Sequence, residues 1–342
     1  MKQENIELET IGWDLFFKDN FSPYKIKGFI PGRITQVRRK TYIALTELGE
    51  INVKISGKFR FTHEKEAYPV VGDWVVIKDS NDIGVIQAVL PRKSKISRKV
   101  AGKTIEEQII VSNVDIVWIV SGLDKEFNIQ LIERYLTLVS ESGAKPVIIL
   151  NKSDLCDNIN EKMEEVRKLS QEIPIHLLSA ESNKLDILKQ YLLKGKTIAI
   201  IGSSGVGKST IINKLLGIER QKTGAVRESD NQGRHTTTYR EMIVFPNGGI
   251  IIDNPGMDEI QLWFKGNDLA DAFKDIEDIS LLCKFKNCNH KSEPGCAIKD
   301  AIENKELDQR RYEHYLKLRK ESHILSAKQS NMTRKHPDYK KS

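Results

Sequence analysis

The central part of this 342-residue chain contains Gly202-Ser203-Ser204-Gly205-Val206-Gly207-Lys208-Ser209-Thr210, which is the strongest indication of its fold. This stretch follows the apolar run 197–201, which predicts a strand, and it leads into a predicted helix that starts near Lys208. Glycines at these spacings let the backbone point its amide hydrogens inward around phosphates. In this strand-to-helix context the stretch predicts a phosphate loop, with Lys208 reaching the β- and γ-phosphates and the Ser209 hydroxyl binding Mg²⁺.

A second motif, Asn151-Lys152-Ser153-Asp154, indicates which base is read. It follows the apolar run 147–150, which predicts a buried strand. Guanine presents an N1 hydrogen and an exocyclic amine on one edge, and a carboxylate such as Asp154 accepts both. We expect Asn151 to brace the loop and the stem of Lys152 to lie against the base. Ser179-Ala180 ends the next predicted strand, where a backbone amide would meet the guanine carbonyl.

The fourth motif, Asp253-Asn254-Pro255-Gly256, ends the apolar run 249–252. We expect Asp253 to hold Mg²⁺ through water and the Gly256 amide to contact the γ-phosphate. Ras-like GTPases continue with a glutamine that orients the attacking water, whereas this chain has Met257, which cannot. Either another group positions the water, or hydrolysis is slow without a partner.

The segment 223–239 lies between the phosphate loop and Asp253, where the first switch belongs. It contains three consecutive threonines, and we assign Thr237 to Mg²⁺ while Thr236 and Thr238 remain alternatives. His235 is the candidate for orienting the water in place of the missing glutamine. The alternative is that His235 only contacts phosphate or RNA.

The order of these motifs is itself informative. In an ordinary GTPase the phosphate loop comes first, whereas here the two base-reading motifs precede it, so the order is circularly permuted. Apolar runs and helical spacings alternate from residue 108 onward, which predicts a mostly parallel α/β sheet. The predicted strands are 109–120, 147–150, 175–178, 197–201, 242–245 and 250–252, and the clearest helix is 129–142. All four motifs follow strand C-terminal ends, where such sheets bind ligands.

The N-terminal part predicts a different fold. Short alternating runs at 32–37, 51–55, 72–77 and 84–90 are typical of a small closed β-barrel such as an OB-fold. Such barrels often bind oligonucleotides, although the fold alone does not prove it. Residues 92–103 carry six cations and no acid, which indicates either a solvated linker or a strip that contacts phosphates. The first 25 residues match no motif.

Three of the four cysteines lie within one short stretch together with a histidine: Cys283, Cys288, His290 and Cys296. Three thiolates and one imidazole form the ligand set of a closed, tetrahedral, structural Zn²⁺ site, and we expect one zinc ion per chain. A redox or catalytic role is the weaker interpretation, because four protein ligands leave no open position. Cys156 is interpreted as a small packing residue.

Composition limits the partners. The net charge of +7 indicates an anionic partner, nucleic acid first, or else merely a basic cytosolic protein. The polar N-terminus has no hydrophobic signal region, and no apolar run approaches a membrane span, so we expect a cytoplasmic protein without a membrane partner. Residues 303–342 contain 11 Lys or Arg against 6 Asp or Glu, which predicts a basic, helical tail.

Together these residues resemble the bacterial family of ribosome small subunit-dependent GTPases A. The resemblance covers nearly the whole chain, and its most specific parts are the motif order, the run Gly233-Arg234-His235-Thr236-Thr237-Thr238 and the cysteine–histidine spacing. The family likewise has an apolar residue at the position of Met257. Asn254 departs from the threonine usual in the family, with little expected effect because that position is not a ligand.

The resemblance implies three domains: 1–105 with the OB-fold, 106–277 with the permuted GTPase, and 278–342 with the zinc site and tail. It also implies a factor that assists late maturation of the small ribosomal subunit and hydrolyses GTP to GDP under stimulation by the subunit. We expect a monomer that contacts ribosomal RNA and not DNA. The competing hypotheses are a nucleotide-gated RNA-binding module with negligible hydrolysis and an unrelated ATPase. Asp154 argues against the ATPase.

Overall fold

The structure is a computed structural model that describes residues 6–39, 41–62, 67–80, 83–99, 107–125, 127–169, 172–180, 185–217, 240–246, 248–253, 273–286, 288–291, 293–309, 311–313 and 315–320. Its strands are β1 (Ile30–Val37), β2 (Tyr42–Thr46), β3 (Gly49–Ile55), β4 (Trp74–Lys78), β5 (Gly84–Val89), β6 (Lys95–Lys99), β7 (Glu107–Ser112), β8 (Ile116–Gly122), β9 (Lys145–Asn151), β10 (Ile175–Leu177), β11 (Thr197–Ile201), β12 (Glu241–Val244) and β13 (Ile250–Asp253). Its helices are η1 (Leu8–Ile11), α1 (Leu15–Lys25), α2 (Gly57–Thr62), α3 (Ile129–Ser140), η3 (Ser153–Leu155), α4 (Ile159–Arg167), α5 (Asp186–Lys189), α6 (Lys208–Leu216), α8 (Lys274–Leu281) and α9 (Ala297–Glu303).

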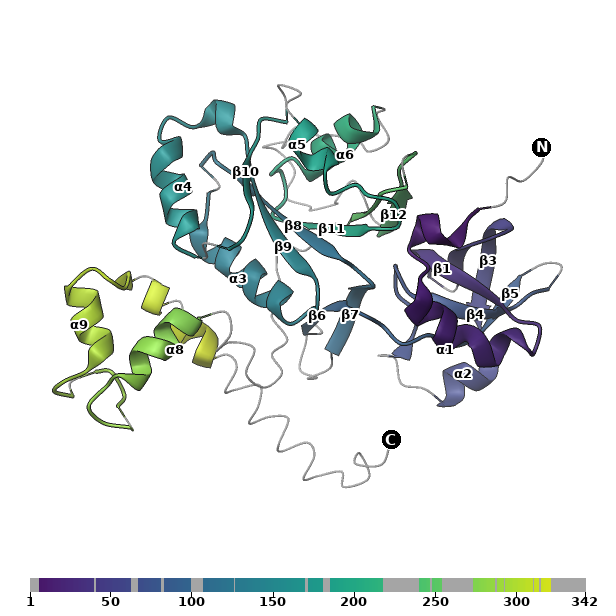
Figure 1. The fold of residues 1–342 in the computed structure, drawn as a ribbon, viewed down its shortest axis with the longest axis horizontal. Helices are drawn as coiled ribbons and strands as arrows, with labels where there is room; N and C mark the ends of the chain where they lie inside the picture. Colours follow the sequence, from purple (N-terminus) through teal and green to yellow (C-terminus); the bar gives the residue numbers. More distant parts are fainter. Residues whose placement is uncertain are drawn as a thin grey trace.

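The central sheet runs β10-β9-β8-β11-β13-β12 (Figure 1). The first five strands are parallel, and β12 is antiparallel to β13, so the predicted mostly parallel sheet is confirmed. Strand β8 explains the two layers of helices. Its side chains alternate, so that Val117 and Ile119 pack with α3 and α4, whereas Trp118 and Val120 pack with α5 and α6 on the opposite face.

The N-terminal strands form a closed barrel in the order β1-β2-β3-β5-β4, because β4 pairs back to β1. Its interior is a separate apolar cluster that includes Ile34, Val53, Val75 and Ile86. Strand β1 also meets β12 at the register pair Gln36↔Glu241, and the two side chains hydrogen-bond at 2.8 Å. The barrel is therefore joined edge to edge with the central sheet.

The single strand predicted for residues 109–120 is wrong. The chain forms β7 and β8 there, and β7 pairs with β6 in a separate two-stranded ribbon, with one further bridge from Val111 to Val71. The break lies at Asn113, whose φ of 54° is left-handed and cannot continue a strand. The apolar pattern of the sequence does not mark this break, because both strands are buried and apolar residues lie on both sides of it. The ribbon spans the predicted boundary between residues 105 and 106.

Residues 6–25, which matched no motif, pack between the barrel and the central sheet. The Trp13 ring meets the ring of Trp74 in β4 edge to face, with centroids 4.6 Å apart. Phe17 and Phe21 belong to the same aromatic cluster. Gly195, just before β11, makes the close approach possible. Its φ is 74°, and a Cβ there would lie 2.6 Å from the carbonyl oxygen of Glu9.

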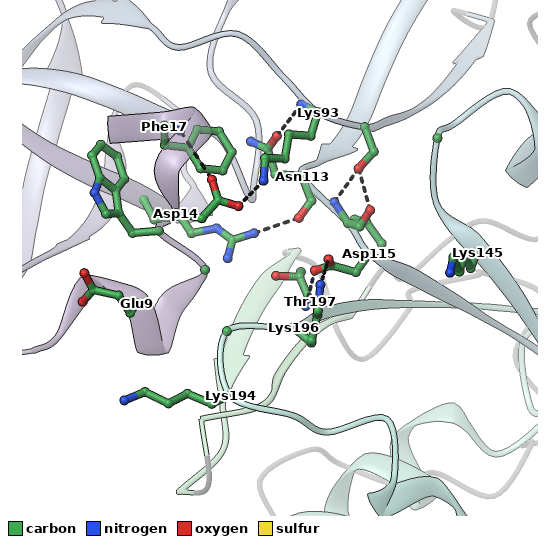
Figure 2. A pocket seen from close by; sticks show the side chains of 17 residues that line it. Glu9, Asp14, Phe17, Lys93, Asn113, Asp115, Lys145, Lys194, Lys196 and Thr197 are labelled. Carbon is green, nitrogen blue, oxygen red and sulfur yellow. Dashed lines mark hydrogen bonds and ion pairs between the residues drawn. The ribbon is translucent and has the colours of Figure 1, made fainter. Parts of the chain in front are cut away.

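Figure 2 shows the seam that results, in which side chains of the N-terminal segment face those at the start of β8 and β11. It encloses a cavity of about 400 Å³. Arg33 of β1 is 1% exposed and donates to the carbonyls of Ile11, Gly72 and Asn113, which belong to three different segments. Burial lowers the pKa of Arg33 to about 10, so the guanidinium remains charged at neutral pH.

The C-terminal helices α8 and α9 lie beyond α3, on the side away from the barrel (Figure 1). Arg311 connects them to the sheet domain, because it donates to Glu133 of α3 and, at 2.8 and 2.9 Å, to Asp275 of α8. Glu133 is 4% exposed, so this is a buried attachment. Within the described residues, no helix is both long and apolar enough to cross a membrane.

Candidate nucleotide site and metal centre

Asn151 joins three of the predicted motifs. It is the last residue of β9 and is 2% exposed. Its side-chain amide donates to the carbonyl of Val206 in the phosphate loop at 2.8 Å, and its side-chain oxygen accepts from the Ala180 amide at 2.9 Å. The predicted bracing role therefore has a concrete geometry: one side chain holds the base-reading loop, the Ser179-Ala180 turn and the phosphate loop together.

The phosphate loop has the backbone that its glycines predict. Gly202, Gly205 and Gly207 all have positive φ, at 148°, 76° and 99°. A Cβ on Gly202 would lie 2.2 Å from the carbonyl oxygen of Val120, and one on Gly207 would lie 2.3 Å from the side-chain nitrogen of Asn151. Only glycine therefore fits at these two positions, for reasons of both conformation and space.

Helix α6 begins at Lys208, directly after the loop, so its unpaired N-terminal amides face the loop. The Lys208 ammonium donates at 2.6 Å to the carbonyls of Gly202 and Ser203, which holds it over the loop. Ser209 and Thr210 follow in the first turn of the helix, and Ser204 and Gly205 are exposed at the tip of the loop. This arrangement suits an anion that accepts hydrogen bonds from main-chain amides and from one lysine.

The base-reading loop leaves β9 at the same edge of the sheet. Lys152 has a left-handed φ of 60°, and Ser153 to Leu155 form the short helix η3. The Asp154 carboxylate is exposed and, among the described residues, accepts no hydrogen bond. The Lys152 ammonium instead pairs with Asp124, a residue that the sequence analysis missed because it belongs to no motif.

Asp253 is the last residue of β13 and is 3% exposed. It lies in register with Ile200 of β11, one residue before the strand ends at the phosphate loop. Asp253 thus ends the strand next to β11, and β11 leads through the phosphate loop to Ser209 in the first turn of α6. His235, Thr237 and Gly256 lie outside the described residues.

The four predicted metal ligands come together. The ligand atoms of Cys283, Cys288, His290 and Cys296 all lie within 4.8 Å of one another. His290 Nδ1 is 3.5 Å from Cys283 Sγ and 3.4 Å from Cys296 Sγ, close to the separation of about 3.6 Å that tetrahedral zinc imposes on a sulfur and a nitrogen ligand. Burial, followed by the charge of Arg319, lowers the pKa of His290, which favours the neutral imidazole that binds metal. The cluster is suited to hold a metal ion.

The basic strip 92–103 is partly accounted for by ion pairs. Arg92 makes two hydrogen bonds of 2.7 Å to Asp73, which is fully buried. Lys93 pairs with Asp14, and Lys95 pairs with Glu107 at 2.6 Å across the β6–β7 ribbon. Three cations of the strip thus have acidic partners, and one of them, Lys95, belongs to the ordered strand β6.

A glycine-rich loop, its helix and a base-reading loop converge on the carboxyl edge of a parallel sheet, in permuted chain order. These features define a circularly permuted P-loop nucleotide-binding protein. The family model for the RsgA GTPase matches residues 89–263, and the chain belongs to this family of GTP-hydrolysing enzymes.

Relatives match over nearly the whole chain. A small ribosomal subunit biogenesis GTPase RsgA of Opitutus terrae is 39% identical and covers 92% of this chain and 89% of its own length. RsgA 1 of Oceanobacillus iheyensis is 45% identical over 87% of this chain and 86% of its own. The crystal structure of YjeQ from Thermotoga maritima superposes with a TM-score of 0.62 at 30% identity, covering 85% of this chain and 97% of that one. YloQ, described as a circularly permuted GTPase, has a TM-score of 0.60 at 25% identity, covering 87% and 96%.

Proposed function

We propose that this chain is a GTPase that binds the small ribosomal subunit and assists its late maturation. The observation that carries this proposal is the match of nearly the full chain to relatives named small ribosomal subunit biogenesis GTPases. The nucleotide motifs converge on one edge of the sheet, which supports the proposal independently. A GTPase needs its base-reading loop and its phosphate loop side by side, and Asn151 joins the two here.

In the proposed site, Asp154 reads the donor edge of guanine, and the Ala180 amide meets the guanine carbonyl. The phosphate loop and Lys208 bind the phosphates, while Ser209, Thr237 and Asp253 hold Mg²⁺ with its waters. The Gly256 amide contacts the γ-phosphate. When bound, Mg²⁺ supplies charge neutralisation at the phosphates, and the protein's own part is to position them.

The cysteine–histidine cluster is proposed to hold one structural zinc ion. The short sulfur–nitrogen separations and the buried Cys296 support this assignment, because they already have the spacing of a closed tetrahedral set. In this role zinc links α9 to the loop that follows α8. It takes no part in the reaction.

The RNA-facing surface is proposed to comprise the barrel, the basic strip of residues 92–103 and the C-terminal tail. The barrel's strand order, with β3 parallel to β5 and closure between β1 and β4, supports the assignment of an OB-fold. We divide the chain into 1–105, 106–277 and 278–342, and we propose a monomer that acts in the cytoplasm on the ribosomal RNA of the small subunit.

The experiment that tests the function is GTP turnover measured with and without purified small ribosomal subunits. We expect slow turnover by the protein alone and a large increase with subunits, because Met257 offers no hydrogen bond to water and the switch must be ordered by the partner. Subunit binding that depends on the nucleotide, without any increase in turnover, would favour the nucleotide-gated RNA-binding module instead.

His235 is proposed to orient the attacking water once the subunit has ordered the switch. His235→Ala should then reduce subunit-stimulated turnover at least about tenfold, while GTP affinity changes little. Equal losses of turnover and affinity would make His235 a binding residue. Undiminished stimulated turnover would mean that another group positions the water.

A further inference from the structure

The loop after β8 lies between the base-reading loop and the phosphate loop. Strand β8 pairs with β9 on one side and with β11 on the other, so its carboxyl end at Gly122 opens between the two motifs. The amide of Leu123 donates to the carbonyl of Asn151 at 2.8 Å. The first residue of the loop is thus tied directly to the base-reading motif.

Within this loop, Asp124 forms an ion pair with Lys152. The distance from Lys152 Nζ to Asp124 Oδ2 is 2.6 Å, and the two side chains are 27% and 17% exposed. A Cβ at Gly122 would lie 2.8 Å from Asp124 Oδ1 and 3.6 Å from Lys152 Cδ. Both side chains therefore fold over the end of β8, where glycine leaves room for them.

The loop has a second attachment that does not involve Lys152. Lys162 of α4 donates to the carbonyl of Leu123 at 2.7 Å, and its ammonium lies 5.1 Å from the centroid of the Phe127 ring. Contacts on both sides of Asp124 thus fix the loop. The short aspartate is the fixed partner to which the longer lysine side chain is held.

Lys152 needs such a partner for two physical reasons. Its left-handed backbone, with φ of 60°, is costly for a residue with a Cβ and persists only where surrounding contacts maintain it. Its four-carbon stem also loses rotamer entropy when it is ordered. A partly buried carboxylate at 2.6 Å offsets both costs before any nucleotide arrives.

We propose that Asp124 is a positioning residue of the guanine site: it holds Lys152 so that the lysine stem forms one wall against the base, beside the edge-reading Asp154. This inference rests on the proposed guanine-reading role of residues 151–154. Asp124 touches no reacting atom and acts only through Lys152. It should set how long the nucleotide stays bound and not which base is chosen.

The test uses the full-length protein and GDP carrying a fluorescent methylanthraniloyl group. Asp124→Asn keeps the shape of the side chain and removes its charge. We expect its Kd for GDP to rise about tenfold, the factor that corresponds to 1.4 kcal/mol, mainly through faster dissociation and with an unchanged melting temperature. Asp124→Glu, which restores the carboxylate, should recover part of the affinity.

A double-mutant cycle tests whether Asp124 acts through the lysine. In a Lys152→Met background, Asp124→Asn should cause no further loss of GDP affinity, because the contact has already been removed. The matched control is Asp186→Asn, which breaks the exposed Asp186–Lys189 pair of 2.7 Å and should leave GDP affinity as it is in the wild type.

Wild-type GDP affinity in Asp124→Asn would overturn the proposal, as would losses that simply add in the double mutant. A lowered melting temperature with unchanged dissociation at low temperature would make the pair a structural staple and would also overturn it. Inosine diphosphate, which lacks the exocyclic amine, separates this outcome from failure of the proposed function. If the wild type binds GDP and inosine diphosphate equally well, the edge-reading assignment fails, while the coupling of Asp124 to Lys152 can still be measured.

Discussion

The two edges of the central sheet use their polar groups in opposite ways. At the carboxyl edge, helix α6 begins directly after the glycine-rich loop and the Asp154 carboxylate is exposed, so these groups are open to a ligand. At the amino edge, shown in Figure 2, polar groups bond one another: Asp115 accepts from the Thr197 amide within the sheet, and Lys194 donates to Glu7 of the N-terminal segment at 2.7 Å. The Arg33 guanidinium is not available to a ligand there, because it donates hydrogen bonds to three main-chain carbonyls.

The difference shows where function and stability reside in this fold. Parallel strands gather their loops at the carboxyl edge, so the residues that follow each strand can converge on one ligand. At the amino edge the loops do not converge in this way. In this protein the N-terminal segment, residues 6–25, packs there between the barrel and the sheet. Substitutions at the carboxyl edge should therefore change nucleotide chemistry with little effect on stability, and substitutions at the amino edge should do the reverse.

The largest effect should come from Lys208→Ala at the carboxyl edge. It removes the cation nearest the phosphates, and we expect turnover to fall by about a thousandfold, as is usual for the loss of a preorganised charge. Release of inorganic phosphate measures the effect, and the denaturant midpoint should stay at the wild-type value. Turnover at the wild-type rate would mean that the phosphate loop is misassigned.

Arg33→Met should have the largest effect at the amino edge. It leaves the carbonyls of Ile11 and Asn113 without their donor, while Gly72 keeps a hydrogen bond from Asn113. We expect the free energy of unfolding to fall by about 3 kcal/mol. Urea unfolding measures this loss, and GDP affinity under native conditions should not change. A variant as stable as the wild type would show that the buried charge costs as much as its hydrogen bonds contribute.

Asp154→Asn, at the carboxyl edge, should change which base the protein prefers. It removes a charged acceptor from the donor edge of guanine, so we expect GDP affinity to fall roughly thirtyfold while affinity for xanthosine diphosphate, which carries a carbonyl there, increases. Competition binding with both nucleotides measures the switch. Retained guanine preference would exclude Asp154 as the base reader.

Removal of the metal should have the smallest effect on nucleotide binding. Cys288→Ser should lower the zinc content below one ion per chain and loosen the residues around α9, because structural zinc is coupled to folding. GTP affinity should stay within about twofold, since the cluster lies beyond α3, away from the phosphate loop. Metal analysis of natively purified protein provides the baseline, and the absence of zinc there would contradict the assignment.

Several elements could be predicted because their signal is local. The phosphate loop needs positive φ at fixed positions, and glycine marks those positions directly. The four predicted metal ligands lie within one short stretch, so their clustering needed no long-range contact. Strand β11 has the predicted bounds of residues 197–201 because a fully buried parallel strand is a continuous apolar run.

Other features could not be predicted because their signal lies elsewhere in the chain. The break at Asn113 is set by the different partners of β7 and β8, and no apolar pattern records a change of partner. Asp124 acquires its role from Lys152, 28 residues away. The N-terminal segment carries aromatic residues that are typical of any core. Where they pack depends on distant residues, namely the Trp74 ring that Trp13 contacts and Gly195, which allows the backbone at Glu9 to come close.

The sequence alone predicts which ligand chemistry this protein is suited to, because phosphate, guanine and metal are each recognised by a few residue types at short spacing. How the barrel is attached to the sheet and how the base-reading loop is supported became visible only in the folded chain. Those contacts join residues far apart in the chain, such as Arg33 with Asn113 and Asp124 with Lys152. Their energy comes from burial and pairing, which depend on the neighbours that folding brings together.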